Sequence, residues 1–516
     1  MHSARLTFIA LAASLVVASC GGGGDGNNGF VFTPVAQVPP APPAPPPPPP
    51  AVAPPPGPAP EETRLQDSRT SFAPANPAAT TFTAMAAAGG GDTFDYAGTS
   101  RWAGMLGGAQ YNVEVPKNWN GKLVMYAHGY AGESNLLQVN APPIRRHLLQ
   151  QGYAWAASSY SKNFYDVRVG VEDTNALALQ FNTIAKAGGR ELAAPDRVYI
   201  TGHSMGGHIT AAAIEDETYA TANHKMKYNG AVPMCGVVGD TELFDYFAAA
   251  QVAAQTLAGQ ASYPTPKWAD IVVQVTGVLF TKFDTSAITP TSPLGLQYAS
   301  VLQNLTGGER PLFNLGLGMG ASFTAVWGVF GSDGTVTGIL NKSTLDTNRF
   351  TYKIDGDTPN SDALNAAAQK LTAVTDANRL RTDGLRWIPK VNGEFKIPVV
   401  TLHTLGDLYV PFSMEQIYNK RVAAKGNSQW LVQRAIRGIT HCDFTVKEQE
   451  EAFDAMVGWE QGGPVPAGDD VVTPATVAAP LYGCAFTRNA TGPDDGSTIP
   501  LVRAQLNAGY SCTPPI

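Results

Sequence analysis

The sequence of 516 residues has no run of Lys or Arg, few cysteines, and no long apolar segment beyond its N-terminal stretch. Its 35 Lys and Arg are outnumbered by 42 Asp and Glu, which gives a net charge of −7 at pH 7. This balance argues against nucleic acid as a partner and against a polybasic patch for anionic membranes. Because no later apolar run could cross a bilayer, any membrane contact is expected at the N-terminus.

Cysteine is also scarce. No CxxC pair or His/Cys cluster among the five cysteines suggests a metal site, so none is predicted. If Cys20 carries a lipid, the remaining four cysteines suffice for two disulfides in an oxidising compartment, with three possible pairings. These four are Cys235, Cys442, Cys484 and Cys512.

The N-terminus is typical of an exported protein. Arg5 precedes an apolar run from Leu6 to Val17, which is too short to span a bilayer comfortably. The following residues resemble a bacterial lipobox, so we expect a signal peptide over 1–19 and a lipid on Cys20. The alternative is an ordinary secretory signal with a chance cysteine.

Residues 20–92 are rich in Gly, Pro and Ala and predict a disordered tether. A polyproline II segment from Pro34 to Pro60 would reach roughly 80 Å at about 3.1 Å per residue. Such a tether holds a globular body away from the surface that anchors it. We therefore expect a periplasmic or outer-membrane lipoprotein, or an extracellular protein, that contacts a membrane only through Cys20.

From Thr93 onward, continuously apolar, strand-like segments alternate with helical patterns. This alternation predicts an α/β fold with a mostly parallel sheet and helices on both faces. The strands are expected at 109–115, 123–127, 153–159, 197–201, 229–236, 397–403 and 429–438, and the helices at 142–152, 171–188 and 207–217.

The segment 237–395 is far longer than the roughly 20 to 25 residues that a strand-to-strand crossover needs. It predicts a helix-rich cap or lid between two parts of the core, 93–236 and 396–461. The alternative is a subdomain whose many aromatics form its own core. Residues 462–516 are expected to be a loop-like extension, in which Cys484 and Cys512 could form a disulfide.

Ser204 stands in a G-x-S-x-G motif between Gly202 and Gly206. With 53 glycines in the chain, about 0.3 such matches are expected by chance, so the context must support the motif. A strand pattern precedes Ser204 and a helix pattern follows it, as a nucleophile elbow requires. Ser204 is therefore the candidate nucleophile.

An activated serine needs a base and a carboxylate that orients the base. Asp407 follows the expected strand 397–403 in a turn after Gly406, and His441 follows the strand 429–438 by a short loop. Each residue by itself is an ordinary loop residue. Together with Ser204, however, they place three catalytic roles at three strand ends in the order Ser, Asp, His.

Backbone amides are expected to form an oxyanion hole. One donor is the N–H of Met205, just after the nucleophile, and the second is the N–H of Tyr130, in the loop after the strand 123–127. Gly129 lets this loop turn inward. His128 is expected to order the loop by hydrogen bonds and not to act as the base.

The span from Tyr111 to Gly458 resembles the α/β-hydrolase superfamily through "HGY", "GHSMGG", "GDLYVP" and "GITHCDF". The resemblance implies a serine hydrolase of the esterase or lipase type, with Ser204, Asp407 and His441 as its triad and no metal or organic cofactor. The motifs do not single out a subfamily.

The pair His441-Cys442 is similar to that of tannases and feruloyl esterases, whose disulfide joins the neighbours of the catalytic Ser and His. This chain departs from that pattern, because His203 and not Cys precedes Ser204. We expect Cys442 to bond Cys235 instead, at the end of the strand 229–236. The alternatives are two buried thiols or pairing of Cys442 with Cys484 or Cys512.

Hydrolysis of carboxylic esters through an acyl-enzyme is the leading functional hypothesis. The large insertion and the tether fit a bulky, aromatic or polymeric ester, but no substrate-binding residue can be identified from the sequence. A serine peptidase is the first alternative, because the same triad cleaves amides. A non-catalytic surface-binding module is the second.

Overall fold

The computed structural model describes residues 82, 84–85, 93–132, 136–260, 268–290, 292–320, 322–329, 344–374, 388–509 and 512. The expected signal peptide, Cys20 and nearly all of the tether lie outside the described residues. No helix in these ranges is long and apolar enough to cross a membrane.

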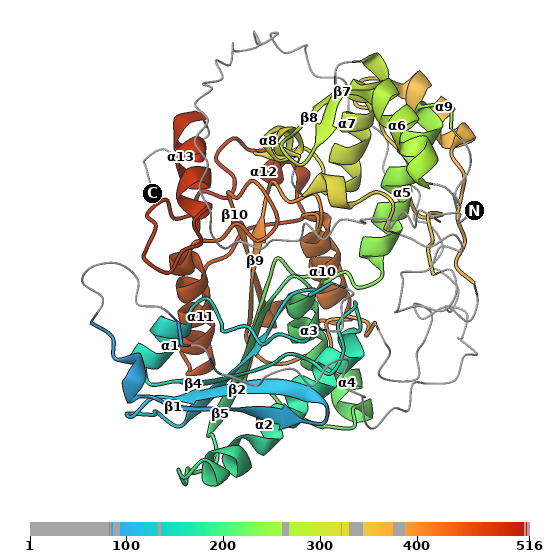
Figure 1. Ribbon diagram of the computed structural model, residues 1–516. Helices are drawn as coiled ribbons and strands as arrows, with labels where there is room; N and C mark the ends of the chain where they lie inside the picture. Colours follow the sequence, from blue (N-terminus) through green and yellow to red (C-terminus); the bar gives the residue numbers. More distant parts are fainter. Residues whose placement is uncertain are drawn as a thin grey trace, which may run out of the picture.

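The core is an eight-stranded sheet with the strand order β1-β2-β4-β3-β5-β6-β9-β10 (Figure 1). β2 runs antiparallel to both β1 and β4. The other neighbouring strands of this sheet, in the order β4-β3-β5-β6-β9-β10, are parallel to one another. The strands are β1 (Ser100–Leu106), β2 (Ala109–Val115), β3 (Lys122–Ala127), β4 (Ala154–Ser158), β5 (Arg197–His203), β6 (Gly230–Met234), β9 (Val399–Thr404) and β10 (Leu431–Ile436).

Two features at the antiparallel end of the sheet were not predicted. The edge strand β1 forms a hairpin with β2 around Gly107 and Gly108, both of which have positive φ. In addition, β2 and β3 are consecutive in the chain but are not neighbours, because β4 lies between them. The connection between β2 and β3 therefore passes the position of β4 and does not close a hairpin.

Helices cover both faces of the sheet because the strand residues alternate between two apolar layers. Leu123 and Met125 of β3 pack in the same cluster as residues of α2 and α3. Val124 and Tyr126 face the opposite layer, with residues of α1 and α11. The helix expected over 207–217 is in fact two, α3 and α4. The core elements are η1 (Tyr96–Gly98), α1 (Arg145–Gln150), α2 (Val167–Ala187), α3 (Met205–Ala213), α4 (Asp216–Thr221), α10 (Ser413–Ala424), η4 (Ser428–Trp430) and α11 (Val446–Glu460).

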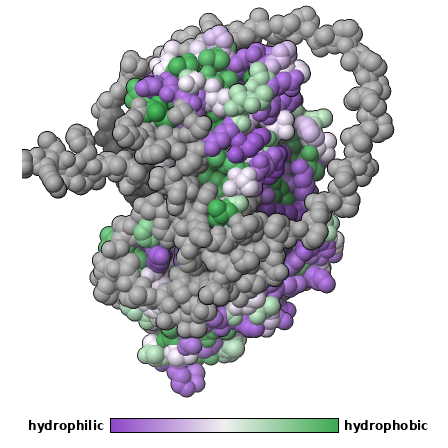
Figure 2. All heavy atoms as spheres, turned by 90° about the vertical axis from the view of Figure 1, so that its right-hand side faces the viewer, coloured by the Kyte–Doolittle hydropathy of each residue, from purple (hydrophilic) through white to green (hydrophobic). Residues whose placement is uncertain are grey.

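The described part of the insertion 237–395 is helix-rich and lies at the upper right of Figure 1. Its rings pack on one another, with Tyr298, Phe323 and Trp327 buried and in mutual ring contact. In Figure 2, which views the right-hand side of Figure 1, polar and apolar residues are interspersed among the coloured atoms. Its elements are α5 (Glu242–Leu257), α6 (Trp268–Leu279), the hairpin of β7 (Phe280–Asp284) and β8 (Ala287–Pro290), α7 (Pro293–Leu305), α8 (Phe313–Met319), η2 (Phe323–Ala325) and α9 (Thr358–Ala367).

The prediction that the extension after Gly462 is loop-like is wrong in part. It contains a short helix, α12 (Pro474–Val477), and a longer one, α13 (Ile499–Gly509). Arg503 of α13 is almost fully buried and donates to the carbonyl oxygens of Arg437 and Asp443 at 2.7 and 2.8 Å. The extension is thus packed against the loop that carries His441.

Candidate active site

Ser204 occupies a sharp turn between β5 and α3. Its φ of 57° and ψ of −120° lie in a region that residues with a Cβ rarely adopt. The turn presents the side chain at the carboxyl edge of the sheet, at the N-terminus of α3. This strained strand–turn–helix geometry is that of a nucleophile elbow.

The glycines around Ser204 are required by close backbone approach. A Cβ on Gly202 would overlap the carbonyl oxygen of Gly206, and a Cβ on Gly206 would overlap the carbonyl oxygen of Ala127, at the end of β3. Any side chain at these positions would force the elbow away from the neighbouring strand.

The structure brings Ser204, His441 and Asp407 into one line of hydrogen bonds. The Ser204 hydroxyl lies 2.8 Å from His441 Nε2, and His441 Nδ1 donates to Asp407 Oδ2 at 2.5 Å. The Asp407 side chain is fully buried, and that of His441 is 14% exposed. In this arrangement the carboxylate fixes the tautomer that leaves Nε2 free to accept the serine proton.

Asp407 is oriented by its own turn as well as by the histidine. Its second oxygen, Oδ1, accepts from the backbone N–H groups of Tyr409 at 2.9 Å and Val410 at 3.0 Å. Because both oxygens are engaged, the carboxylate plane is fixed relative to the His441 ring. We call residues 405–410 the acid turn.

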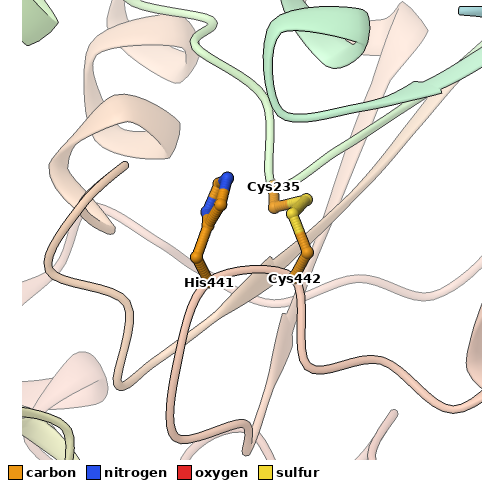
Figure 3. Close-up of side chains that lie close together, drawn as sticks. All are labelled: Cys235, His441 and Cys442. Atoms are coloured by element: carbon orange, nitrogen blue, oxygen red, sulfur yellow. A yellow bond between two sulfur atoms is a disulfide. The ribbon is translucent and has the colours of Figure 1, made fainter. Parts of the chain in front are cut away.

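A disulfide lies directly beside the histidine. Cys442 is bonded to Cys235, which follows β6, and their Cα atoms are 5.4 Å apart. Figure 3 shows this bond next to the imidazole of His441. The second bond joins Cys484 to Cys512. The structure therefore has the pairing that the sequence analysis favoured, and neither tail cysteine bonds Cys442.

The ligand atoms of Cys235, His441 and Cys442 lie within 4.8 Å of one another, a spacing that could suggest a metal centre. The two sulfurs are bonded to each other, however, and so do not offer the thiolates that a metal of this ligand set requires. The grouping follows from the disulfide beside the imidazole.

The expected oxyanion hole adjoins the serine on the side of the loop after β3. Met205 is the first residue of α3, and an amide in the first turn of a helix has no partner within the helix. A Cβ built on Gly129 would lie 3.4 Å from Ser204 Cβ, so the loop lies against the nucleophile. The role of the Tyr130 amide stays a prediction.

Two further histidines near the serine are not arranged as bases. His203 lies between Tyr126 Oη at 3.2 Å and Gln449 Oε1 at 3.0 Å, and burial lowers its pKa to about 4. His128 bonds the Gly129 carbonyl at 2.7 Å, and burial lowers its pKa as well. Both are therefore neutral at pH 7, and His128 orders its loop as expected.

Sequence reasoning did not identify Tyr409 as part of the site. Its ring packs against the His441 ring at a centroid distance of 5.7 Å, and it stacks on Phe247 of α5 at 5.3 Å. The position of Tyr409 two residues after Asp407 was the only available signal. The contact with Phe247 depends on how the insertion folds back, which the sequence does not show.

No family model matches the chain. A segment of 67 residues is 30% identical to the o-phthalyl amidase of Xanthobacter agilis, and this segment spans 13% of the chain and 15% of that enzyme. Among solved structures, feruloyl esterase B from Aspergillus oryzae is 15% identical, with a TM-score of 0.36, over 72% of this chain and 82% of that one. Candida antarctica lipase A is 14% identical, with a TM-score of 0.34, over 78% and 81%.

The identity of the fold rests on the geometry of this chain. Parallel strands end at one edge of the sheet, and Ser204, Asp407 and His441 follow three of them in the order that the motif requires. The chain has the α/β-hydrolase fold.

Proposed function

We propose that this protein is a serine hydrolase that cleaves carboxylic esters through an acyl-enzyme on Ser204. The observation that carries the proposal is the position of His441, which bonds the Ser204 hydroxyl on one side and a fully buried carboxylate on the other. A serine hydroxyl becomes a useful nucleophile only when such an oriented base can take its proton.

In the first half of the reaction, Ser204 Oγ attacks the acyl carbon while its proton moves to His441 Nε2. The amides of Met205 and Tyr130 would stabilise the tetrahedral oxyanion. When the intermediate collapses, the ester C–O bond breaks and the imidazolium returns the proton to the departing alcohol. Water then repeats the attack with His441 as base, which releases the acid and restores Ser204.

Fluorophosphonate labelling tests this proposal directly. Wild-type protein should be modified covalently at Ser204, and the Ser204→Ala variant should not be modified. Ser428→Ala, which changes an exposed serine in η4, is the matched control and should label like wild type. A wild-type protein that resists labelling would leave the non-catalytic binding module as the better hypothesis.

Amide cleavage is the second candidate. The same triad can expel an amine, and the short segment shared with an amidase points in this direction. Comparing p-nitrophenyl esters with peptide anilides and with aromatic amides separates the two candidates. An ester preference of several orders of magnitude is expected.

We also propose that the enzyme is exported, with a lipid on Cys20, and that it acts on bulky, aromatic or polymeric esters. The two disulfides are consistent with an oxidising compartment. Labelling of cells with a radioactive fatty acid should mark wild-type protein and spare Cys20→Ala. An activity panel over acyl chain length and aromatic esters tests the substrate class, and a strict preference for short soluble esters would remove the polymer hypothesis.

A further inference from the structure

The acid turn is held by two side chains that come from the insertion. Arg310, between α7 and α8, donates through Nε to the carbonyl oxygen of Leu405 at 2.8 Å. Tyr246 of α5 donates its hydroxyl to the carbonyl oxygen of Leu408 at 2.7 Å. Both bonds are buried, and they capture the backbone on either side of Asp407.

The core contributes a third bond of the same kind. His403 of β9 donates through Nε2 to the carbonyl oxygen of Val410 at 2.7 Å, and it is fully buried. Leu405, Leu408 and Val410 are thus each anchored by a buried side-chain donor. Since Tyr409 and Val410 supply the amides that bind Asp407, these anchors determine where the amides point.

The insertion also packs directly against the backbone of the acid turn. A Cβ on Gly316 of α8 would overlap the backbone of Gly406. The backbone N–H of Ser413, just after the turn, donates to the Thr306 carbonyl at 3.1 Å. The insertion and the acid turn therefore share a packed interface next to Asp407.

Arg310 brings a buried positive charge to this interface. It is only 5% exposed, and its other hydrogen bonds are to the neutral groups Thr306 Oγ1 at 3.1 Å and the Gly308 carbonyl at 3.0 Å. Its guanidinium also lies over the Phe313 ring, 5.2 Å from the centroid. Burial lowers its pKa to about 10, so it remains protonated at neutral pH. Burying a cation is costly, and Tyr246 and Asp407 both oppose the lowering of the Arg310 pKa.

We infer that Arg310 and Tyr246 are positioning residues for Asp407, so that this part of the insertion is a structural component of the acid site. The inference rests on the proposed function, because it assigns these residues to the Ser204–His441–Asp407 relay. It also implies that α5 and the segment around Arg310 cannot swing away as a lid without releasing the acid turn.

A double-mutant cycle with Asp407→Asn tests the inference. Arg310→Met keeps an unbranched apolar stem and removes both the charge and the donors, so kcat should fall by about 10²-fold, the cost of a misplacement near 1 Å. KM should change little, because neither Arg310 nor Asp407 contacts the substrate in the proposed mechanism. In the Asp407→Asn background, Arg310→Met should have almost no further effect, because the relay it supports is already lost.

Matched variants separate positioning from general stability. Arg434→Met removes another buried guanidinium that bonds backbone carbonyls, those of Ala467 and Glu451, and it should leave kcat within a few-fold. Tyr246→Phe is a milder version of the test. Its control is Tyr298→Phe, which removes a hydroxyl that donates to the Ala250 carbonyl and accepts from Trp327 Nε1.

Two measurements keep the outcomes distinct. The His441 Nδ1 proton in the hydrogen bond to Asp407 should give a strongly downfield NMR signal that Arg310→Met and Tyr246→Phe weaken and their controls preserve. If wild-type protein labels with fluorophosphonate but the Arg310 and Asp407 effects simply add, the positioning role is wrong and the serine hydrolase remains. If wild-type protein does not label and the downfield signal is missing, both proposals fail.

Discussion

Replacing Cys235 and Cys442 together by alanine breaks the cross-link beside His441, and replacing Cys484 and Cys512 provides the matched comparison. The first bond spans 207 residues and the second 28. Loop-closure entropy then assigns about 5 kcal/mol of stability to the first and about 3.5 kcal/mol to the second. Alanine is a better replacement than serine at Cys235, because this position is fully buried and a serine hydroxyl there would have no water to bond.

The two variants should differ more in turnover than in stability. Cys442 follows His441 directly, and without its bond the histidine loop loses its tie to the end of β6. A displacement of the imidazole near 1 Å costs about 10²-fold in kcat. The variant without Cys484 and Cys512 should keep kcat within a few-fold, since neither residue touches the relay.

Urea unfolding followed by tryptophan fluorescence gives the free energies, and initial rates on a p-nitrophenyl ester give kcat. Both variants are to be assayed at a temperature and urea concentration at which they are folded, so that lost stability is not mistaken for lost catalysis. Equal kcat values in the two folded variants would refute the idea that the disulfide positions His441.

Three further predictions follow from single side chains. Asp407→Asn should lower kcat by about 10⁴-fold through the wrong imidazole tautomer, and a loss under tenfold in ester assays would contradict the triad. Burial lowers the pKa of His208 to about 4, so below pH 6.5 the unfolded chain binds a proton that the folded chain does not, and stability falls as pH falls. His208→Gln should reduce the slope of the unfolding free energy against pH by up to about 1.4 kcal/mol per pH unit between pH 6.5 and 4. Urea unfolding at several pH values measures this slope, and equal slopes for variant and wild type would rule the prediction out. Arg503→Met removes the ion-pair partner of the buried Glu448 carboxylate, which keeps the backbone N–H donors of Thr445 and Arg488. The substitution should cost about 3–5 kcal/mol along with much of kcat, and an unchanged melting temperature would contradict this expectation.

The relay could be predicted because of a property of parallel sheets. Strands that run the same way end at the same edge, so Ser204, Asp407 and His441 could be placed together without knowledge of side-chain packing. The same reasoning brought Cys235 to that edge and suggested its bond with Cys442. Charge and hydropathy alone would not have given these contacts, because they describe each segment separately.

The parts that escaped prediction depend on packing between distant segments. β1 is half-exposed at the edge of the sheet and lacks an alternating pattern, so its sequence carries a weak strand signal. In α13, Ile499 and Leu506 are buried, but Arg503 takes the intervening core position and hides the apolar period. The bonds of Arg310 and Tyr246 to the acid turn require the path of the insertion, which no local pattern contains.

The burial of Arg503 has a consequence for the order in which the protein becomes active during its synthesis. The histidine loop receives its contacts from α13 only after residues beyond 500 have left the ribosome, although Ser204 is made about 300 residues earlier. A nascent chain that already contains Ser204 and its neighbouring glycines therefore still lacks the α13 contacts that hold the loop of His441. The contacts that α13 makes with the histidine loop therefore form after every member of the relay has been synthesised.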